Sequence, residues 1–303
     1  MIKLENYFGI CLFGGGFLGF LFPSLFSWGQ PFLSYLLMLA LFFGFLRVDL
    51  AEVTHLKKGM GRLFAYALLA SIFMPSAFFF ASGWIPFELR LGLFLMLATC
   101  AGANAPLIVS FLRLRILWAS VFVAMTSLLV TFALPVMVAE FFKFTLTIDA
   151  LEMSLFLGKI IIIPAILAVI FRKYFGTLAH QIQSTAGTIG TLNLAFFMAV
   201  LVSLNHGYIQ ESGLSWLTLY AILGMFVVFF IRFFVGFLLP AKSADERWTN
   251  GLMFVIINNN LVILLAAEFF SPEIFWIALL SQIPWIMAFP AIRIFRNKFI
   301  HHV

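Results

Sequence analysis

The sequence predicts an all-α polytopic membrane protein, from its composition and from the length of its apolar runs. Of the 303 residues, 64% are hydrophobic and 10% are charged, whereas a soluble domain has about a quarter charged residues. In lipid, only helices and closed barrels satisfy the backbone hydrogen bonds. The apolar runs are roughly 17–25 residues long, as in spanning helices, whereas a barrel would show alternating segments of about ten residues. We therefore expect a helical protein with the lipid bilayer as a partner.

Ten apolar segments follow one another along the chain, and we interpret each as one transmembrane helix. They cover residues 8–26, 31–46, 63–80, 88–112, 116–142, 152–171, 187–204, 214–239, 247–269 and 272–295. Lys3 followed by the apolar run from Phe8 would also fit a cleaved signal peptide. The run continues past Pro23 to Phe26, and no small-residue cleavage site follows it. We therefore expect this run to be the first transmembrane helix.

The charges between these segments predict their orientation, because cytoplasmic loops are rich in Lys and Arg. Loops after even-numbered segments, and the tail, carry the basic residues Arg47, Lys57, Lys58, Arg62, Arg113, Arg115, Arg172, Lys173, Lys242, Arg247, Arg293, Arg296 and Lys298. Loops after odd-numbered segments carry mainly the acids Glu88, Asp149, Glu152, Glu211, Glu268 and Glu273, with Lys143 and Arg90 as exceptions. We therefore expect both termini in the cytoplasm and the protein in the bacterial inner (plasma) membrane. The basic residues lie at helix ends rather than on one stripe, so we expect no nucleic-acid partner.

Two short polar stretches interrupt the fourth and ninth segments. The first lies within residues 99–109 and the second within residues 255–263. When Asn104 is aligned with Asn258, the aliphatic residues that follow also align, and the two stretches lie about half a chain apart. Paired interrupted helices in corresponding positions of two halves are typical of the binding site of a secondary transporter.

Other segments match at the same offset of about 155 residues, which indicates an internal repeat. Residues 37–42 resemble residues 192–197, and residues 133–135 resemble residues 288–290. A repeat of five helices places its second copy inverted in the membrane. The two repeats would comprise residues 1–145 and residues 146–303.

The interrupted segments have the residue types expected where a helix restarts inside the membrane. Asn104 and Pro106 predict an N-cap followed by a first-turn proline, and the Asn run at 258–260 predicts a second cap. Helix N-termini directed at the membrane centre favour an anion or a polar ligand. Alternatively, these asparagines only cap the helices or bond one another. The candidate substrate-binding residues are Thr99, Cys100, Asn104, Pro106, Asn193, Asn258, Asn259, Asn260 and Gln282.

Two basic residues, Lys159 and Arg232, fall inside apolar segments. Each is about two helical turns from a membrane edge, so we expect its side chain to reach the interface. The sequence has no nucleophile–base pair at membrane depth and no His, Cys or carboxylate cluster with metal-ligand spacing. We therefore expect neither an enzyme nor a bound cofactor.

The ten helices, the two crossed interruptions and the stretch Cys100-x-Gly102-x-x-Ala105 resemble the bile acid:sodium symporter family. That family has Cys-Pro-Gly-Gly-Thr-Ala-Ser-Asn at the first interruption. The resemblance implies a panel domain of helices 1, 2, 6 and 7 and a core domain of helices 3–5 and 8–10. It also implies alternating access by movement of one domain against the other, with organic anions carried together with sodium.

The chain departs from the family at the residues that bind sodium. The Ser-Asn pair of the family falls on Pro106 and Leu107, and of its Glu-x-Gly-x-Gln-Asn stretch only Asn258 remains. With a serine of the fifth helix at Ser120, the candidate cation site reduces to Ser120 and Asn258, without the carboxylate that helps to hold such an ion.

We therefore expect a divergent member of this family that transports an organic anion or small polar metabolite without its usual sodium coupling. Two alternatives remain open. One is a transporter that resembles the auxin efflux carriers, which also have ten helices and crossed interruptions. The other is a descendant that no longer transports and acts as a sensor or a membrane scaffold.

Overall fold

The computed structural model describes residues 8–46, 59–212 and 215–287. Most of these residues are helical, and within them the only β-type pairing is one isolated antiparallel bridge, between Ala101 and Ile257. The helices of the first half are α1 (Phe8–Leu21), α2 (Pro23–Phe26), η2 (Ser27–Phe32), α3 (Leu33–Leu46), α5 (Met60–Leu68), η4 (Leu69–Phe73), α6 (Met74–Ala81), α7 (Phe87–Ala98), α8 (Ala105–Phe111) and α9 (Ile116–Phe141). Those of the second half are α10 (Ala150–Tyr174), α11 (Gly176–Leu204), α12 (His206–Ser212), α13 (Trp216–Leu238), α14 (Ala244–Val255), α15 (Asn259–Phe269) and α16 (Pro272–Leu280).

Six helical stretches in the described part are long and apolar enough to cross a bilayer. They are Pro23–Leu46, Met60–Ala81, Ile116–Phe141, Ala150–Tyr174, Gly187–Leu204 and Trp216–Leu238. Shorter apolar helices cover Gly9–Leu21, Asn259–Phe269 and Pro272–Met287. The chain is therefore an all-α integral membrane protein, as its composition predicts. The end of the expected tenth segment, the repeat match at 288–290 and several of the loop and tail charges lie outside the described residues.

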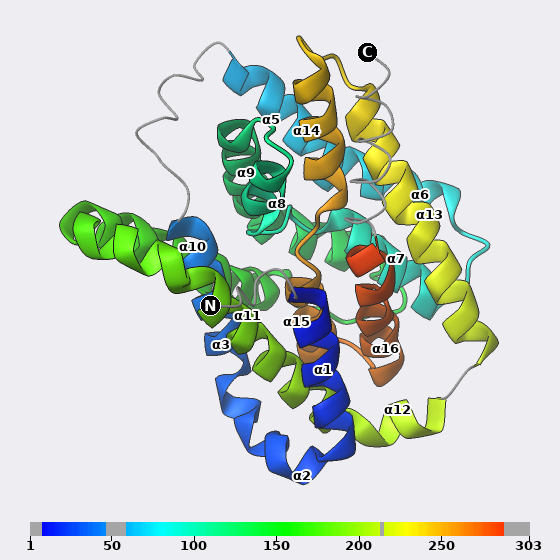
Figure 1. The fold of residues 1–303 in the computed structure, drawn as a ribbon. Helices are drawn as coiled ribbons and strands as arrows, with labels where there is room; N and C mark the ends of the chain where they lie inside the picture. Colours follow the sequence, from blue (N-terminus) through cyan, green and yellow to red (C-terminus); the bar gives the residue numbers. More distant parts are fainter. Residues whose placement is uncertain (1–7, 47–58, 213–214, 288–303) are drawn as a thin grey trace.

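The helices pack in two groups that are visible in Figure 1. In one group, α11 contacts α1, α3 and α10, and α3 contacts α10. The other group comprises α5–α9 and α13–α16, and it meets the first mainly where α9 packs against α10. In the first group, α1 approaches α11 closely because Gly15 and Gly19 face it, and a Cβ at either glycine would collide with the backbone of Ala195 or Ala199. Small residues allow membrane helices to pack at such short range.

The fourth and ninth apolar segments are each divided into two helices, at the places that the sequence predicts. The first interruption covers residues 99–104, between α7 and α8, and the second only residues 256–258, between α14 and α15. The alignment of Asn104 with Asn258 therefore matches the starts of α8 and α15 but not the ends of α7 and α14. We call the place where the two interruptions meet the crossing, and it lies in the second helix group.

Candidate functional site

The backbones of the two interruptions run antiparallel and hydrogen-bond to each other. The Gly102 N–H donates to the Ile256 carbonyl at 2.8 Å, and the Asn258 N–H donates to the Cys100 carbonyl at 2.9 Å. Gly102 allows this approach, because a Cβ there would lie 3.0 Å from the Ile257 carbonyl oxygen. An irregular backbone at membrane depth needs partners inside the protein, and each interruption supplies them to the other.

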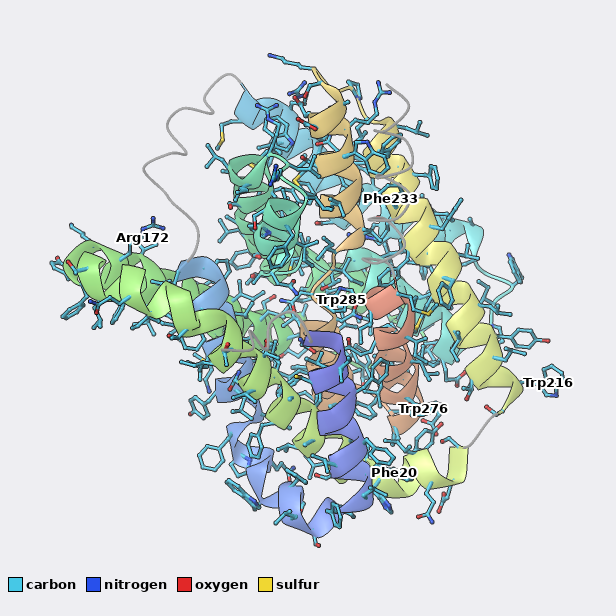
Figure 2. The ribbon with its side chains drawn as sticks, viewed as in Figure 1. Phe20, Arg172, Trp216, Phe233, Trp276 and Trp285 are labelled. Atoms are coloured by element: carbon cyan, nitrogen blue, oxygen red, sulfur yellow. The ribbon has the colours of Figure 1, made fainter. Side chains whose placement is uncertain are left out.

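Two further contacts fix the crossing from neighbouring helices. The Ala101 N–H donates to Thr126 Oγ1 of α9 at 3.1 Å, and the Ile257 carbonyl accepts from Trp285 Nε1 at 3.2 Å. Figure 2 shows Trp285 near the centre of the molecule, beside the second interruption. The thiol of Cys100 lies beside the side chains of Ser127 and Asn258. The crossing is therefore a rigid, buried junction rather than a loose loop.

The two helix starts at the crossing differ in how they are capped. Asn258 acts as the N-cap of α15, since its Oδ1 accepts from the Leu261 N–H at 3.3 Å. Asn104 stands at the N-cap position of α8, and Pro106 lies in the first turn, but the Asn104 side chain makes no capping bond.

Several polar groups beside the crossing are buried without a hydrogen-bond partner. Asn259, in the first turn of α15, is 3% exposed, and neither its Oδ1 nor its Nδ2 makes a hydrogen bond. Gln282 donates from Nε2 to Asn260 Oδ1 at 3.1 Å, while its Oε1 has no partner. An unsatisfied buried polar group costs about 1–3 kcal/mol, so such groups require an explanation. Binding of a polar ligand would supply the missing bonds.

The structure distributes the sequence-predicted site residues between the crossing and other places. Those at or beside the crossing are Thr99, Cys100, Asn104, Pro106, Asn258, Asn259, Asn260 and Gln282. Asn193 instead links α11 to α3, donating from Nδ2 to the Leu36 carbonyl at 2.7 Å. Ser120 donates to the Ile116 carbonyl of its own helix at 3.1 Å, about 9 Å along α9 from Thr126 at the usual helical rise.

Thr126 and Ser127 are the residues of α9 that reach the crossing, and both are buried. They form a polar pair in the middle of a 26-residue apolar helix. Such a pair in the sequence indicates a polar contact near the middle of the helix. A serine or threonine in a membrane helix often bonds its own backbone. The Thr126 hydroxyl also bonds the first interruption, because it lies on the face of α9 that meets this segment.

Arg232 of α13 corrects the expectation that its side chain reaches the membrane interface. Arg232 is 1% exposed. Its Nε donates to the Phe254 carbonyl and its Nη1 donates to the Leu97 carbonyl, both at 2.5 Å. These carbonyls belong to the last turns of α14 and α7, so one side chain holds the ends of both interrupted helices.

A cavity of about 590 Å³ lies between α3, α9 and α10, at the boundary of the two helix groups. It is open to the outer surface, where Leu128 and Ile166 of its lining are exposed. Its walls are apolar apart from Ser127, Arg172 and Lys173. Ser127 also lies beside Cys100, so the cavity reaches the side chains that surround the crossing. Arg172 and Lys173 are in the last turn of α10, and Figure 2 shows Arg172 on the far end of that helix. The volume is in the usual range of small-molecule sites, about 300–1,000 Å³.

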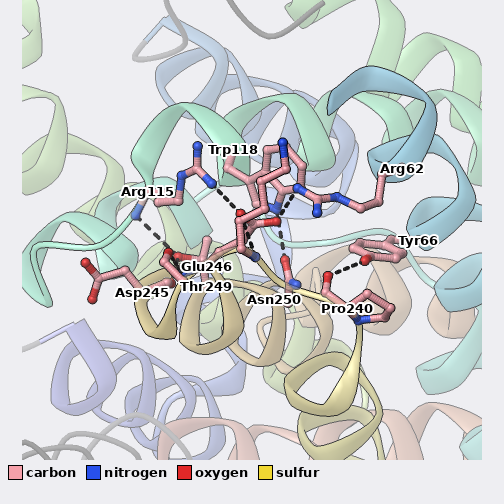
Figure 3. Close-up of polar contacts among 11 residues, drawn as sticks. Arg62, Tyr66, Arg115, Trp118, Pro240, Asp245, Glu246, Thr249 and Asn250 are labelled. Carbon is pink, nitrogen blue, oxygen red and sulfur yellow. Dashed lines mark hydrogen bonds and ion pairs between the residues drawn. The ribbon is translucent and has the colours of Figure 1, made fainter. Parts of the chain in front are cut away.

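A second buried polar region lies at the start of α14, and we call it the Glu246 cluster (Figure 3). Glu246 is fully buried and forms ion pairs with Arg62 of α5 and with Arg115, at 2.5 Å in the second pair. Trp118 lies against both guanidinium groups and donates from Nε1 to Asn250 Oδ1 at 2.9 Å. The cluster therefore ties α14 to α5 and α9.

The sequence matches no model of a known protein family and no curated protein. In the described part of the chain, no group of three or more His, Cys, Asp or Glu could hold a metal ion. The functional conclusion therefore depends on the geometry of the crossing and of the adjacent cavity.

Proposed function

We propose that this protein is a secondary transporter that moves an organic anion or a small polar metabolite by alternating access. The observation that carries the proposal is the buried Asn259 side chain, which has no hydrogen-bond partner at the meeting point of two interrupted membrane helices. Interrupted helices that meet at membrane depth are the usual place of substrate sites in secondary transporters. Asn259 can both donate to and accept from a ligand.

The ten-helix arrangement as two inverted repeats, residues 1–145 and 146–303, is part of this proposal. The reciprocal hydrogen bonds of the two interruptions support the repeat arrangement, because each interruption donates one backbone N–H to a carbonyl of the other. The two helix groups would be the panel domain and the core domain that the family resemblance implies. Ten helices place both termini on the same side of the membrane, and the basic loops indicate that this side is the cytoplasm. The bacterial inner membrane is the proposed location.

The cavity supports an organic anion as the substrate. Its apolar walls would bury a hydrocarbon body, and Arg172 and Lys173 would attract a negative group to one end. Because α3 and α10 belong to one helix group and α9 to the other, relative movement of the groups would open and close this space. Alternating access requires such movement around a fixed site.

Exchange in proteoliposomes tests the proposal. Vesicles are loaded with an unlabelled acid and the labelled acid is added outside, with short dicarboxylates, medium-chain monocarboxylates and steroid carboxylates as probes. We expect exchange of at least one probe, at equal rates in sodium chloride and choline chloride. Asn259→Ala removes both bonding groups, and we expect it to slow the exchange about tenfold or more.

Asn205→Ala is the matched control, because Asn205 bonds the Leu201 carbonyl of its own helix end at 3.0 Å. We expect this variant to retain the wild-type rate. If folded wild-type protein exchanges none of the probes, the transporter proposal is contradicted and the sensor or scaffold alternative gains support.

A further inference from the structure

Both carbonyls that bond Arg232 have lost their helical partners to the crossing. In a continuous helix, the Leu97 carbonyl would accept from the N–H of Ala101, and the Phe254 carbonyl would accept from the N–H of Asn258. The Ala101 N–H instead donates to Thr126 Oγ1, and the Asn258 N–H donates to the Cys100 carbonyl. The guanidinium therefore bonds the two acceptors that the interruptions leave free.

The charge of Arg232 also suits this position. A helix C-terminus carries about half a negative elementary charge, so the ends of α7 and α14 together carry about one. In the described part of the chain, no carboxylate forms an ion pair with Arg232. A buried charge without compensation is very costly. The two helix ends therefore act as the counter-charge of the guanidinium.

Cation-coupled transporters use the same groups for a different ion. In such proteins, the carbonyls of unwound segments and the C-terminal ends of half-helices coordinate sodium. In this chain those carbonyls already accept hydrogen bonds from a permanent cation. A sodium ion therefore does not fit between the ends of α7 and α14, because it would lose its ligands and be repelled by the guanidinium.

We propose that Arg232 is a built-in cation of the crossing, which holds α7 and α14 together in place of a bound metal ion and makes the carrier independent of sodium. Arg232 is thus a positioning residue for the crossing. The claim that transport is independent of sodium rests on the proposed function. The claim that the Arg232 guanidinium holds the ends of α7 and α14 does not.

The test measures the melting temperature of purified full-length protein in detergent, which requires no transport. For the wild type, we expect the same melting temperature in sodium chloride and in choline chloride of equal ionic strength. For Arg232→Ala, we expect a fall of about 5–10 °C, because two buried acceptors lose their cation. Millimolar guanidinium or methylguanidinium should restore part of this loss, and urea, a neutral molecule of similar shape, should not.

Two further variants distinguish the effect of the Arg232 charge and its hydrogen bonds from the effect of side-chain packing. Arg232→Lys keeps the charge but cannot reach both carbonyls as a rigid fork, so we expect a smaller loss than for Arg232→Ala. Arg90→Met is the matched control, because Arg90 also donates to a carbonyl near a helix end, that of Phe79 at 2.5 Å, but far from the crossing. We expect this variant to show no rescue by guanidinium.

Three results would overturn the proposal. They are a higher melting temperature of the wild type in sodium than in choline, a melting temperature of Arg232→Ala equal to that of the wild type, and a loss in Arg232→Ala that guanidinium does not restore. Failure of transport with all expected melting results would contradict the proposed function alone.

Discussion

The Glu246 cluster and the crossing are both buried polar regions that join helices far apart in sequence, but they differ in which of their groups are paired. Both carboxylate oxygens of Glu246 pair with guanidinium groups. At the crossing the backbone is paired, whereas the Asn259 amide and one atom of Gln282 are not. In the cluster the charged groups are paired, which favours one arrangement of helices, although Asn250 Nδ2 has no partner. At the crossing, both polar atoms of the Asn259 side chain lack a partner.

The position of the two regions fits this difference. The Glu246 cluster joins α5, α9 and α14 within one helix group, so the relative movement that the proposed function requires would leave it intact. The crossing lies beside the cavity between the groups, through Ser127. We therefore expect substitutions in the cluster to change stability, and substitutions of the unpaired amides to change ligand binding.

The largest loss of stability is expected for Glu246→Gln. This change keeps the shape but leaves two guanidinium groups without their counter-charge, at a cost of about 3 kcal/mol or more. Thermal unfolding in detergent measures it, and exchange by the folded fraction should be unaffected. Glu140→Gln is the control, since its pair with Lys143 is exposed and worth less than about 1 kcal/mol. Equal losses in the two variants would contradict a structural role for the cluster.

An intermediate loss is expected for Thr126→Val. Valine keeps the volume but leaves the Ala101 N–H buried without an acceptor, at a cost of about 1–3 kcal/mol. Thr131→Val is the control, because Thr131 bonds only the Ser127 carbonyl of its own helix, at 2.8 Å. The unfolding temperatures of both variants measure the difference. If Thr131→Val lowers the unfolding temperature as much as Thr126→Val does, the bond between Thr126 and the crossing does not stabilise the protein more than an ordinary bond within one helix.

The smallest change in stability is expected for Asn259→Ala. The substitution removes polar atoms that have no partner in the protein, so the saved desolvation offsets the lost packing to within about 1 kcal/mol. The same variant is expected to lose exchange activity, and this combination distinguishes a ligand-binding group from a structural one. A fall in melting temperature similar to that of Glu246→Gln would contradict the comparison.

The sequence predicted the helical class and the two interruptions because these features depend on nearby residues. Long apolar runs form spanning helices, and residues such as Asn104 with Pro106 mark a restart wherever the helix lies. The segments expected at 63–80 and 116–142 agree with helical stretches at Met60–Ala81 and Ile116–Phe141. The internal repeat and the site assignments stay predictions, since they depend on relations that the helix positions alone do not test.

The partners of the polar side chains were decided by tertiary structure. The sequence pattern predicts Arg232 at the membrane interface and favours Ser120 as the site residue of α9. In the structure, Arg232 bonds the ends of α7 and α14, and Thr126 bonds the crossing. No sequence pattern marks Glu246 as a buried residue. A hydrogen bond between residues more than a hundred positions apart depends on which helix faces meet.

The sequence by itself therefore determined that the chain forms apolar helices and where two of them are interrupted. Only the tertiary structure decided which of the buried polar groups are paired and which lack a partner. The physical reason is that helix formation satisfies the backbone locally, whereas a side chain finds its partner only after the helices have packed.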